Sequence, residues 1–438
     1  MSSRFNTIRR FLDRLLSSRT VRNIAWVFFG DAMSKAFQVF FTLVLIWEFS
    51  QADYAAMVVF QSLRVLLSSL IGGGINSAMI RYGAEYFSTT HQRPLRLYKA
   101  VLRLETLIYL AVLAGGLLLA RPIALWFYGR QDYGNVLSLG LLAGLGYLMI
   151  QTQRSVYQAE ERFKHFVAAQ WVQTLASLLY VCMLAATNRM TFRLVAVGQI
   201  VVDLVVAAVL LTGSVLQSRA SPQEPLSNGR VWLLLRTARW LMAYSIALAM
   251  LSQMDIVMLS RLGSESQLAA YGVAIKYYLL ALMSLGSVHA VLLPKFSHVD
   301  MQDHHRQWVF VWRWVKVSAL VAVPLLIFDL LGRPLYMWLN GGKYEESFVI
   351  WIILSVGVWI GLIASPSINV LVARQAFRTM FILGVMGLAT ICVGNIVLVP
   401  WLGACGTAAA TVAANAVINV TSLCLVRWSR PTPAVESQ

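Results

Sequence analysis

Residues 121–129 read Arg-Pro-Ile-Ala-Leu-Trp-Phe-Tyr-Gly, and residues 333–341 read Arg-Pro-Leu-Tyr-Met-Trp-Leu-Asn-Gly. Arginine, proline, tryptophan and glycine stand at the same places in these two stretches, which are 212 residues apart. Further matches follow at a shift of 214 residues: Ala159, Phe163 and Lys164 with Ala373, Phe377 and Arg378, Gly72 with Gly286, and Arg81 with Lys295. Matches in the same order at a nearly constant shift indicate two halves of the same architecture. The alternative is chance similarity between two hydrophobic sequences.

Each half consists of apolar segments long enough to cross a bilayer, which takes about 20 residues per helix. The hydropathy pattern predicts about twelve spans, at 24–47, 55–79, 100–120, 135–156, 166–187, 194–216, 240–260, 269–293, 310–331, 347–370, 379–400 and 406–426. Only 13% of the 438 residues are charged, against about 25% in soluble domains. We therefore predict an all-α polytopic membrane protein. Its two six-helix lobes enter the membrane in the same direction, so a pseudo-two-fold axis along the membrane normal relates them.

The predicted domain organisation follows from these spans. Residues 1–23 form a basic amphipathic segment, 24–216 the N-lobe, 217–239 a linker, 240–427 the C-lobe and 428–438 a tail. The first segment reads either as a helix on an anionic leaflet or as a plain topology signal. Of the 36 Lys and Arg residues, 25 lie on the side of the termini and 7 on the opposite side. The positive-inside rule then places both termini in the cytoplasm.

Several functional classes are disfavoured by the composition. The net charge of +17 is spread over short loops between apolar segments, so it does not indicate nucleic-acid binding. No P-loop and no catalytic triad stands out, and we expect neither an enzyme nor a cofactor. The four cysteines have no metal-site spacing, and a cluster at 298–305 reads as a solvated loop, so no metal is expected. Aromatic residues near span ends predict an interfacial belt: Trp126, Tyr128, Trp338, Tyr344, Trp401 and Trp428.

Ionisable residues at membrane depth are the candidate site, because each costs about 2.5–3.5 kcal/mol on insertion scales. The first span carries a polar stripe of Asp31, Ser34, Lys35, Gln38 and Thr42, and the second one of Gln61, Arg64, Ser68, Gly72 and Asn76. The eighth span carries Lys276. Around a cavity between the lobes, Lys35, Arg64 and Lys276, with Gln61, would attract and bind phosphate.

Each of these charges also has a structural interpretation. Lys35 could pair with Asp31 one turn away, and Arg64 could pair with Asp203 or Asp255. The three aspartates are candidates for ion or proton coupling as well. Arg103 and Glu105 lie nearer a span end, where snorkelling to the interface is the favoured account.

Four segments resemble the multidrug/oligosaccharidyl-lipid/polysaccharide exporter superfamily, and within it the polysaccharide transporters of the Wzx flippase type. They are residues 30–36 (Gly-Asp-Ala-Met-Ser-Lys-Ala), 50–55 (Ser-Gln-Ala-Asp-Tyr-Ala), 270–274 (Ala-Tyr-Gly-Val-Ala, with Pro294 at the other end of that span) and 400–411 (Pro-Trp-Leu-Gly-Ala-Cys-Gly-Thr-Ala-Ala-Ala-Thr). The resemblance covers nearly the whole chain. Drug-extruding relatives often pair an acid in the first span with a proline, whereas this span has Asp31 and no proline.

The resemblance implies a V-shaped transporter of the bacterial inner membrane that works by alternating access. The usual substrate is an oligosaccharide on undecaprenyl pyrophosphate, used for lipopolysaccharide, capsule or exopolysaccharide. Cations of the first, second and eighth spans would face the pyrophosphate, which again selects Lys35, Arg64 and Lys276. Membrane lipids, a polysaccharide polymerase and glycosyltransferases are the implied partners.

Two other functions are left open. A cation-coupled exporter of small molecules would use Asp31 or Asp203 as its coupling acid. A non-transporting subunit of a polysaccharide secretion complex would tolerate changes in the cavity and fail when surface loops change.

Overall fold

A computed structural model describes residues 19–90, 93–129, 133–218, 239–297, 323–374 and 376–428, together with the single residues 309, 312, 315, 316 and 319. All regular secondary structure in these ranges is helical. The first half contains α2 (Arg19–Glu48), α3 (Gln51–Thr90), α4 (Leu95–Leu118), α5 (Ala120–Tyr128), α6 (Tyr133–Ala159), α7 (Phe163–Ala186) and α8 (Phe192–Ser218). The second contains α10 (Arg239–Leu251), α11 (Met254–Leu262), α12 (Glu265–Ser297), α14 (Val323–Leu331), α15 (Arg333–Leu339), α16 (Glu346–Ala373), α17 (Phe377–Leu402) and α18 (Ala404–Trp428).

Ten stretches of the described helices are long and apolar enough to cross a membrane. Each coincides with a predicted span. The predicted span 269–293 lies within α12, and the span 310–331 is described as a continuous helix from Val323 onward, with residues 312, 315, 316 and 319 also helical. The predicted all-α polytopic fold is thereby confirmed. Residues 1–18, 219–238, the cluster at 298–305 and 429–438 lie outside the described residues, so the amphipathic segment, the linker and the tail stay predictions.

The repeated Arg-Pro…Trp…Gly stretch forms a short helix in both halves. In the first half it is α5, which ends at Gly129 with a φ of +67°. In the second it is α15, and the chain leaves it through Gly341 with a φ of +62°. Glycine adopts this left-handed backbone conformation readily, because it has no Cβ to clash with the main chain. A left-handed glycine thus follows both short helices, directly after α5 and one residue further on, beyond Asn340, after α15.

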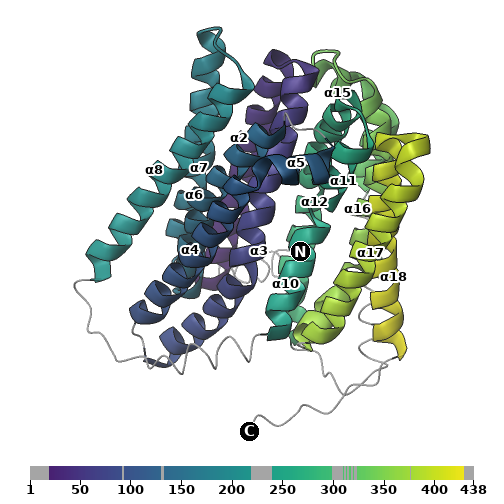
Figure 1. Cartoon of the computed structure of the whole chain (residues 1–438). Coiled ribbons are helices and arrows are strands. Elements are labelled where there is room, and N and C mark those ends of the chain that lie inside the picture. Colours follow the sequence, from purple (N-terminus) through teal and green to yellow (C-terminus); the bar gives the residue numbers. More distant parts are fainter. Residues whose placement is uncertain are drawn as a thin grey trace, which may run out of the picture.

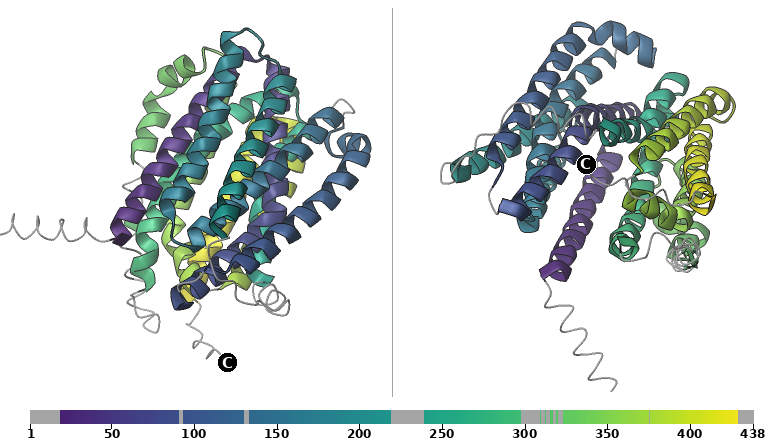
Figure 2. Two further views of the ribbon diagram at one scale, coloured as in Figure 1. Left: turned by 90° about the vertical axis from the view of Figure 1, so that its left-hand side faces the viewer. Right: turned by 90° about the horizontal axis from the view of Figure 1, so that it is seen from below.

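The helices form two groups, with α2–α8 on one side and α10–α18 on the other (Figure 1; Figure 2, right). Within the first group α3 packs on α6 and α2 on α7, and within the second α18 packs on α16 and α17. The groups meet where α3 contacts α10 and α12. We call the side where α2 begins and α18 ends the near side, and the opposite one the far side; they are the lower and upper sides of Figure 1.

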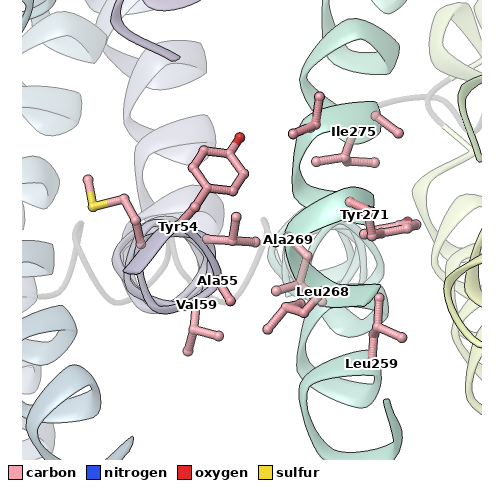
Figure 3. Packing of buried hydrophobic residues seen from close by; sticks show 14 of the residues in the cluster. Tyr54, Ala55, Val59, Leu259, Leu268, Ala269, Tyr271 and Ile275 are labelled. Carbon is pink, nitrogen blue, oxygen red and sulfur yellow. The ribbon is translucent and has the colours of Figure 1, made fainter. Parts of the chain in front are cut away.

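The largest hydrophobic cluster joins the two groups near the far side. Tyr54 and Ala55 of α3 face Ala269 of α12 across the boundary (Figure 3). The helices approach so closely that a Cβ on Gly272 would lie 2.3 Å from a methyl group of Val58. Such dense apolar packing holds the two halves together at this end.

Polar contacts at the far side join the same halves. The ring N–H of Trp47, near the end of α2, donates to the carbonyl of Leu339 (2.9 Å). The ammonium of Lys343 donates to the carbonyls of Ile46 (3.3 Å) and Trp47 (2.6 Å). Tyr344 is buried, and its ring centroid lies 5.7 Å from that of Tyr54.

The predicted aromatic belt is correct only in part. Trp126, Trp338 and Trp401 are exposed on the outer surface, as such a belt requires. Tyr128 and Tyr344 are buried instead, so their side chains fill the protein interior. Tyr128 stacks on Tyr133 with ring centroids 5.8 Å apart.

Candidate transport cavity

A cavity of 1620 Å³ lies between the two groups of helices. Its walls come from α2, α3, α6, α7 and α8 on one side and from α10, α11, α12, α17 and α18 on the other. The hydrophobic cluster around Tyr54 closes it toward the far side. Glu161, between α6 and α7, and Phe163, the first residue of α7, lie at the near side and are among its lining residues. The cavity therefore extends from membrane depth to the near side.

Lys276 and Gln61, both predicted as substrate-binding residues, bridge the cavity. The Lys276 ammonium on α12 donates to the Gln61 side-chain oxygen on α3 at 2.6 Å, which joins the two halves. Lys276 also lies within electrostatic reach of Lys35 and Arg64. An amide oxygen holds the ammonium in place without cancelling its charge. No ion pair to a carboxylate is found for Lys276 within the described residues.

Lys35 also lines the cavity, on α2. Its ammonium donates to the Gln38 side-chain oxygen at 3.3 Å. Asp31, one turn earlier, lines the cavity too, but in the described part of the chain it makes no ion pair with Lys35. The two side chains interact only at longer range. Lys35, like Lys276, thus has an amide for its nearest polar partner.

Arg64 differs, because the suggested pairing with Asp203 is present. Its guanidinium lies 2.7 Å from the Asp203 carboxylate and 4.3 Å from the centroid of the Tyr147 ring. Gln173 donates a further hydrogen bond to Asp203 at 2.9 Å. Arg64 lines the cavity, while Asp203 is fully buried behind it. The charge of Arg64 is therefore balanced within the first half.

A fourth cation, Arg154 on α6, is not predicted by the sequence, because a basic residue near the end of a span reads as a loop charge. Its guanidinium donates to the side-chain oxygens of Gln151 (3.0 Å) and Gln170 and lies 4.4 Å from the ring centroid of Phe166. Its Nε is buried without a hydrogen-bond partner, and no carboxylate within the described ranges pairs with it. Residues 147, 151 and 154 have helical spacing, and this stripe was the available signal.

Asp255 lies where a predicted span is broken. The span 240–260 is two helices, α10 and α11, separated at Ser252 and Gln253, which line the cavity together with Asp255. The Asp255 carboxylate accepts hydrogen bonds from the hydroxyl of Tyr271 (2.5 Å) and from the backbone N–H of Ile256 (2.8 Å). Discontinuous helices are typical of transporter binding sites, because the half-helix N-terminus carries a partial positive charge.

Most of the surface of the remaining wall is apolar, and neutral hydrogen-bonding groups are distributed over it. They are Gln38, Gln61, Gln151, Gln170, Gln173, Gln199, Gln253 and Asn415, with the hydroxyl groups of Thr42, Ser62, Thr174, Ser177, Ser252 and Thr411. Amide and hydroxyl groups both donate and accept hydrogen bonds. This wall is suited to a ligand rich in hydroxyl groups.

A protein family described as "Polysaccharide biosynthesis protein" matches residues 49–349, more than half of the chain. No curated protein matches the sequence.

Solved structures show what the fold is similar to. One is a lipid II flippase, MurJ, in an inward closed conformation (TM-score 0.74, 14% identity, covering 91% of this chain and 87% of that one). Another is a multidrug resistance transporter of the MATE family and MOP superfamily, in an inward-facing conformation (TM-score 0.70, 12% identity, covering 90% of this chain and 94% of that one). A third is a MOP superfamily transporter from Pyrococcus furiosus (TM-score 0.66, 12% identity, covering 94% of this chain and 96% of that one). The fold is thus that of MOP transporters and flippases, in agreement with the prediction that the chain is not an enzyme.

Proposed function

The chain belongs to the polysaccharide biosynthesis protein family, and from that premise we propose that it is a flippase. It moves an oligosaccharide linked to undecaprenyl pyrophosphate across the bacterial inner membrane by alternating access. The glycan then serves the synthesis of lipopolysaccharide, capsule or exopolysaccharide. Membrane lipids surround the protein, and a polymerase and glycosyltransferases act beside it.

The cations of the cavity carry this proposal. Lys35, Lys276 and Arg154 are each held by the oxygen of a glutamine and not by a carboxylate. An unpaired charge away from bulk water is costly, and an anionic ligand removes that cost. A pyrophosphate between α2, α6 and α12 would be bound by both halves of the protein.

Arg64 contributes differently, because Asp203 already balances its charge. It supplies N–H donors to the head group and rigidity to the cavity wall. Asp31, Asp203 and Asp255 remain candidates for ion or proton coupling. Of these, Asp31 and Asp255 line the cavity and have no close ion-pair partner within the described residues, and Asp255 is held by hydrogen bonds from Tyr271 and Ile256.

The size and chemistry of the cavity also favour a glycan. Its 1620 Å³ exceeds the roughly 300–1,000 Å³ of ordinary small-molecule pockets. The amide and hydroxyl groups of the wall match the hydroxyl groups of sugars, although apolar side chains make up most of the lining surface. With both termini in the cytoplasm, as the distribution of Lys and Arg predicts, the cavity opens inward, where such substrates are assembled.

Reconstitution into proteoliposomes tests the proposal. Undecaprenyl-pyrophosphate-linked oligosaccharide is included in the bilayer, and a glycosidase outside reports how fast the glycan becomes exposed. We expect Lys276→Gln to slow this exposure at least about tenfold, which corresponds to about 1.4 kcal/mol of lost binding or barrier lowering. Lys99→Gln, the same change at an exposed site on α4, is the matched control and should have no effect.

Two outcomes would contradict the flippase. One is normal exposure of the glycan in the Lys276→Gln protein. The other is transport of a lipophilic cation, abolished by Asp31→Asn, with no movement of the glycan lipid. The second result would favour the cation-coupled exporter of small molecules.

A further inference from the structure

Glu105 on α4 is fully buried, with none of its surface accessible to solvent. The expectation that Glu105 snorkels to the membrane interface is therefore wrong. Its neighbour Arg103 is exposed, whereas the Glu105 side chain points into the first half of the protein. The Glu105 side chain packs against α3 and α6, and it is not among the lining residues of the transport cavity. A carboxylate in such a place is expensive unless its charge is neutralised.

The surroundings of Glu105 consist of neutral polar groups on α3 and α6. Thr152 forms a hydrogen bond with one carboxyl oxygen, Oε2. The other oxygen, Oε1, is buried and has no hydrogen-bond partner. Asn76 contributes its amide N–H to the Thr152 hydroxyl at 3.4 Å. Gly72 leaves the space for this arrangement, because a Cβ there would lie 2.9 Å from the Asn76 amide nitrogen and 3.5 Å from Oε1.

No charged residue compensates Glu105. Within the described ranges it forms no ion pair, and no charge of a neighbouring helix acts on it. The nearest titratable residues on α4 and on the helices packed against it are Arg64, Arg81 and Tyr82 of α3, Tyr98, Lys99, Arg103 and Tyr109 of α4, and Tyr147, Arg154 and Tyr157 of α6. Arg64, Tyr147 and Arg154 face the cavity, and the Tyr109 hydroxyl donates to the carbonyl of Leu141.

The protons of this cluster can be counted. The Thr152 hydroxyl has one proton to donate, yet its oxygen lies 3.0 Å from the Leu148 carbonyl and also bonds Glu105. If Glu105 carries a proton on Oε2, that proton is donated to Thr152, and Thr152 donates its own to Leu148. The hydrogen bonds of Thr152 are then all formed and no charge is buried, while Oε1 and the Asn76 side-chain oxygen have no donor in the structure. A carboxylate would take the Thr152 proton away from the Leu148 carbonyl and would bury a charge in addition.

We propose that Glu105 is a proton-binding site and that the structure described here is its protonated form. Deprotonation breaks the O–H bond of the Glu105 carboxyl and releases the proton to water. The resulting buried carboxylate must then be solvated, which requires α3, α4 and α6 to separate locally.

Separation of these helices would also affect the contact between the two halves of the protein. Gly74, half a turn from Gly72 and Asn76, is one of the places where α3 touches the second half of the protein: a Cβ on it would lie 2.7 Å from the Cα of Met242 on α10. On α6, Thr152 lies directly after Gln151, which lines the cavity. Loss of the proton therefore loosens the contact between α3 and α10. This consequence, unlike proton binding itself, rests on the proposed transport function.

Infrared difference spectroscopy of the full chain in lipid nanodiscs tests the binding directly. On titration from acid to alkaline buffer, the C=O band of a protonated carboxylic acid should disappear in the wild type. Glu105→Gln should lack this band, and Glu48→Gln, the same change at an exposed residue at the end of α2, should retain it as the matched control. Thr152→Val should keep the band and shift its frequency, because the hydrogen-bond acceptor is removed, and this outcome distinguishes a proton site from a merely structural residue.

Two results would overturn the proposal. An unchanged band in Glu105→Gln would assign the proton to another residue. Loss of the band on replacing choline by sodium at constant pH would make the ligand a metal cation. Proton binding is measured without transport, so a protein that titrates as expected but moves no glycan lipid would refute only the flippase function.

Discussion

Gly272 offers a direct test of how the two halves close at the far side. In the structure, a Cβ on Gly272 of α12 would lie 2.3 Å from a methyl group of Val58 on α3. Real Cβ atoms do not approach so closely, and Gly272→Ala must push the helices apart or displace the valine. Because the two residues belong to different halves, this strain exists only while the far side is closed.

The size of the effect follows from packing energetics. Adding a methyl group to a well-packed interface costs about 1–3 kcal/mol. If the closed state alone bears this cost, the ratio of far-side-open to far-side-closed protein rises about 5- to 150-fold, at 1.36 kcal/mol per factor of ten. Val58→Ala removes the clashing methyl groups. The double variant should therefore return most of the way to the wild-type ratio.

Electron–electron double resonance measures this ratio, with one spin label in each half at the far side. Gly115→Ala on α4 is the control, because a Cβ there meets no atom within 4 Å. An unchanged distance distribution in Gly272→Ala would refute the reasoning. So would a Val58→Ala/Gly272→Ala protein whose shift is the sum of the two single shifts, since contacting residues should couple.

Three further variants address the cavity and its closure. Lys343→Met removes a cation from the carbonyl end of α2, worth about 0.3–1 kcal/mol, and should raise the far-side-open population by less than about fivefold in the same resonance experiment. Arg154→Gln should slow glycan exposure at least about tenfold without lowering the melting temperature, since it removes an unpaired charge; Arg189→Gln, at an exposed loop position, is its control. Gln61→Glu should turn the bond to Lys276 into an ion pair between the halves, worth at least about 1.5 kcal/mol, and slow transport by trapping the bridged state.

The spans and the repeated halves could be predicted because hydropathy and motif spacing depend on local sequence. The Arg-Pro…Trp…Gly stretch forms a short helix in both halves, as a repeat requires. The break between α10 and α11 was not predicted. Ser252 and Gln253 interrupt an otherwise apolar run, but only the neighbouring cavity accounts for a broken helix there.

The candidate site could be predicted only in part, because partners are a tertiary property. Helical stripes correctly brought Lys35, Arg64 and Lys276 to one cavity. Their partners could not be derived: the pairing of Arg64 with Asp203 was one of two alternatives. Arg154 was missed because a charge five residues from the end of α6 reads as a topology signal. The expectation that Glu105 snorkels was wrong for the same reason. The distance of a residue from a helix end does not tell whether its side of the helix is packed against other helices, as it is for Glu105.

The choice of partner explains how one cavity wall can be both stable and able to bind an anion. A carboxylate beside a cation removes the charge that would attract phosphate, as Asp203 does for Arg64. A glutamine oxygen orients the cation and leaves the charge available. Lys35, Lys276 and Arg154 have such partners. The pairing of Lys276 with Gln61 adds one more property: it spans the two halves, so a ligand that takes over the ammonium must also break a bond between them. In the proposed function, this hydrogen bond would link substrate binding to the release of the two halves.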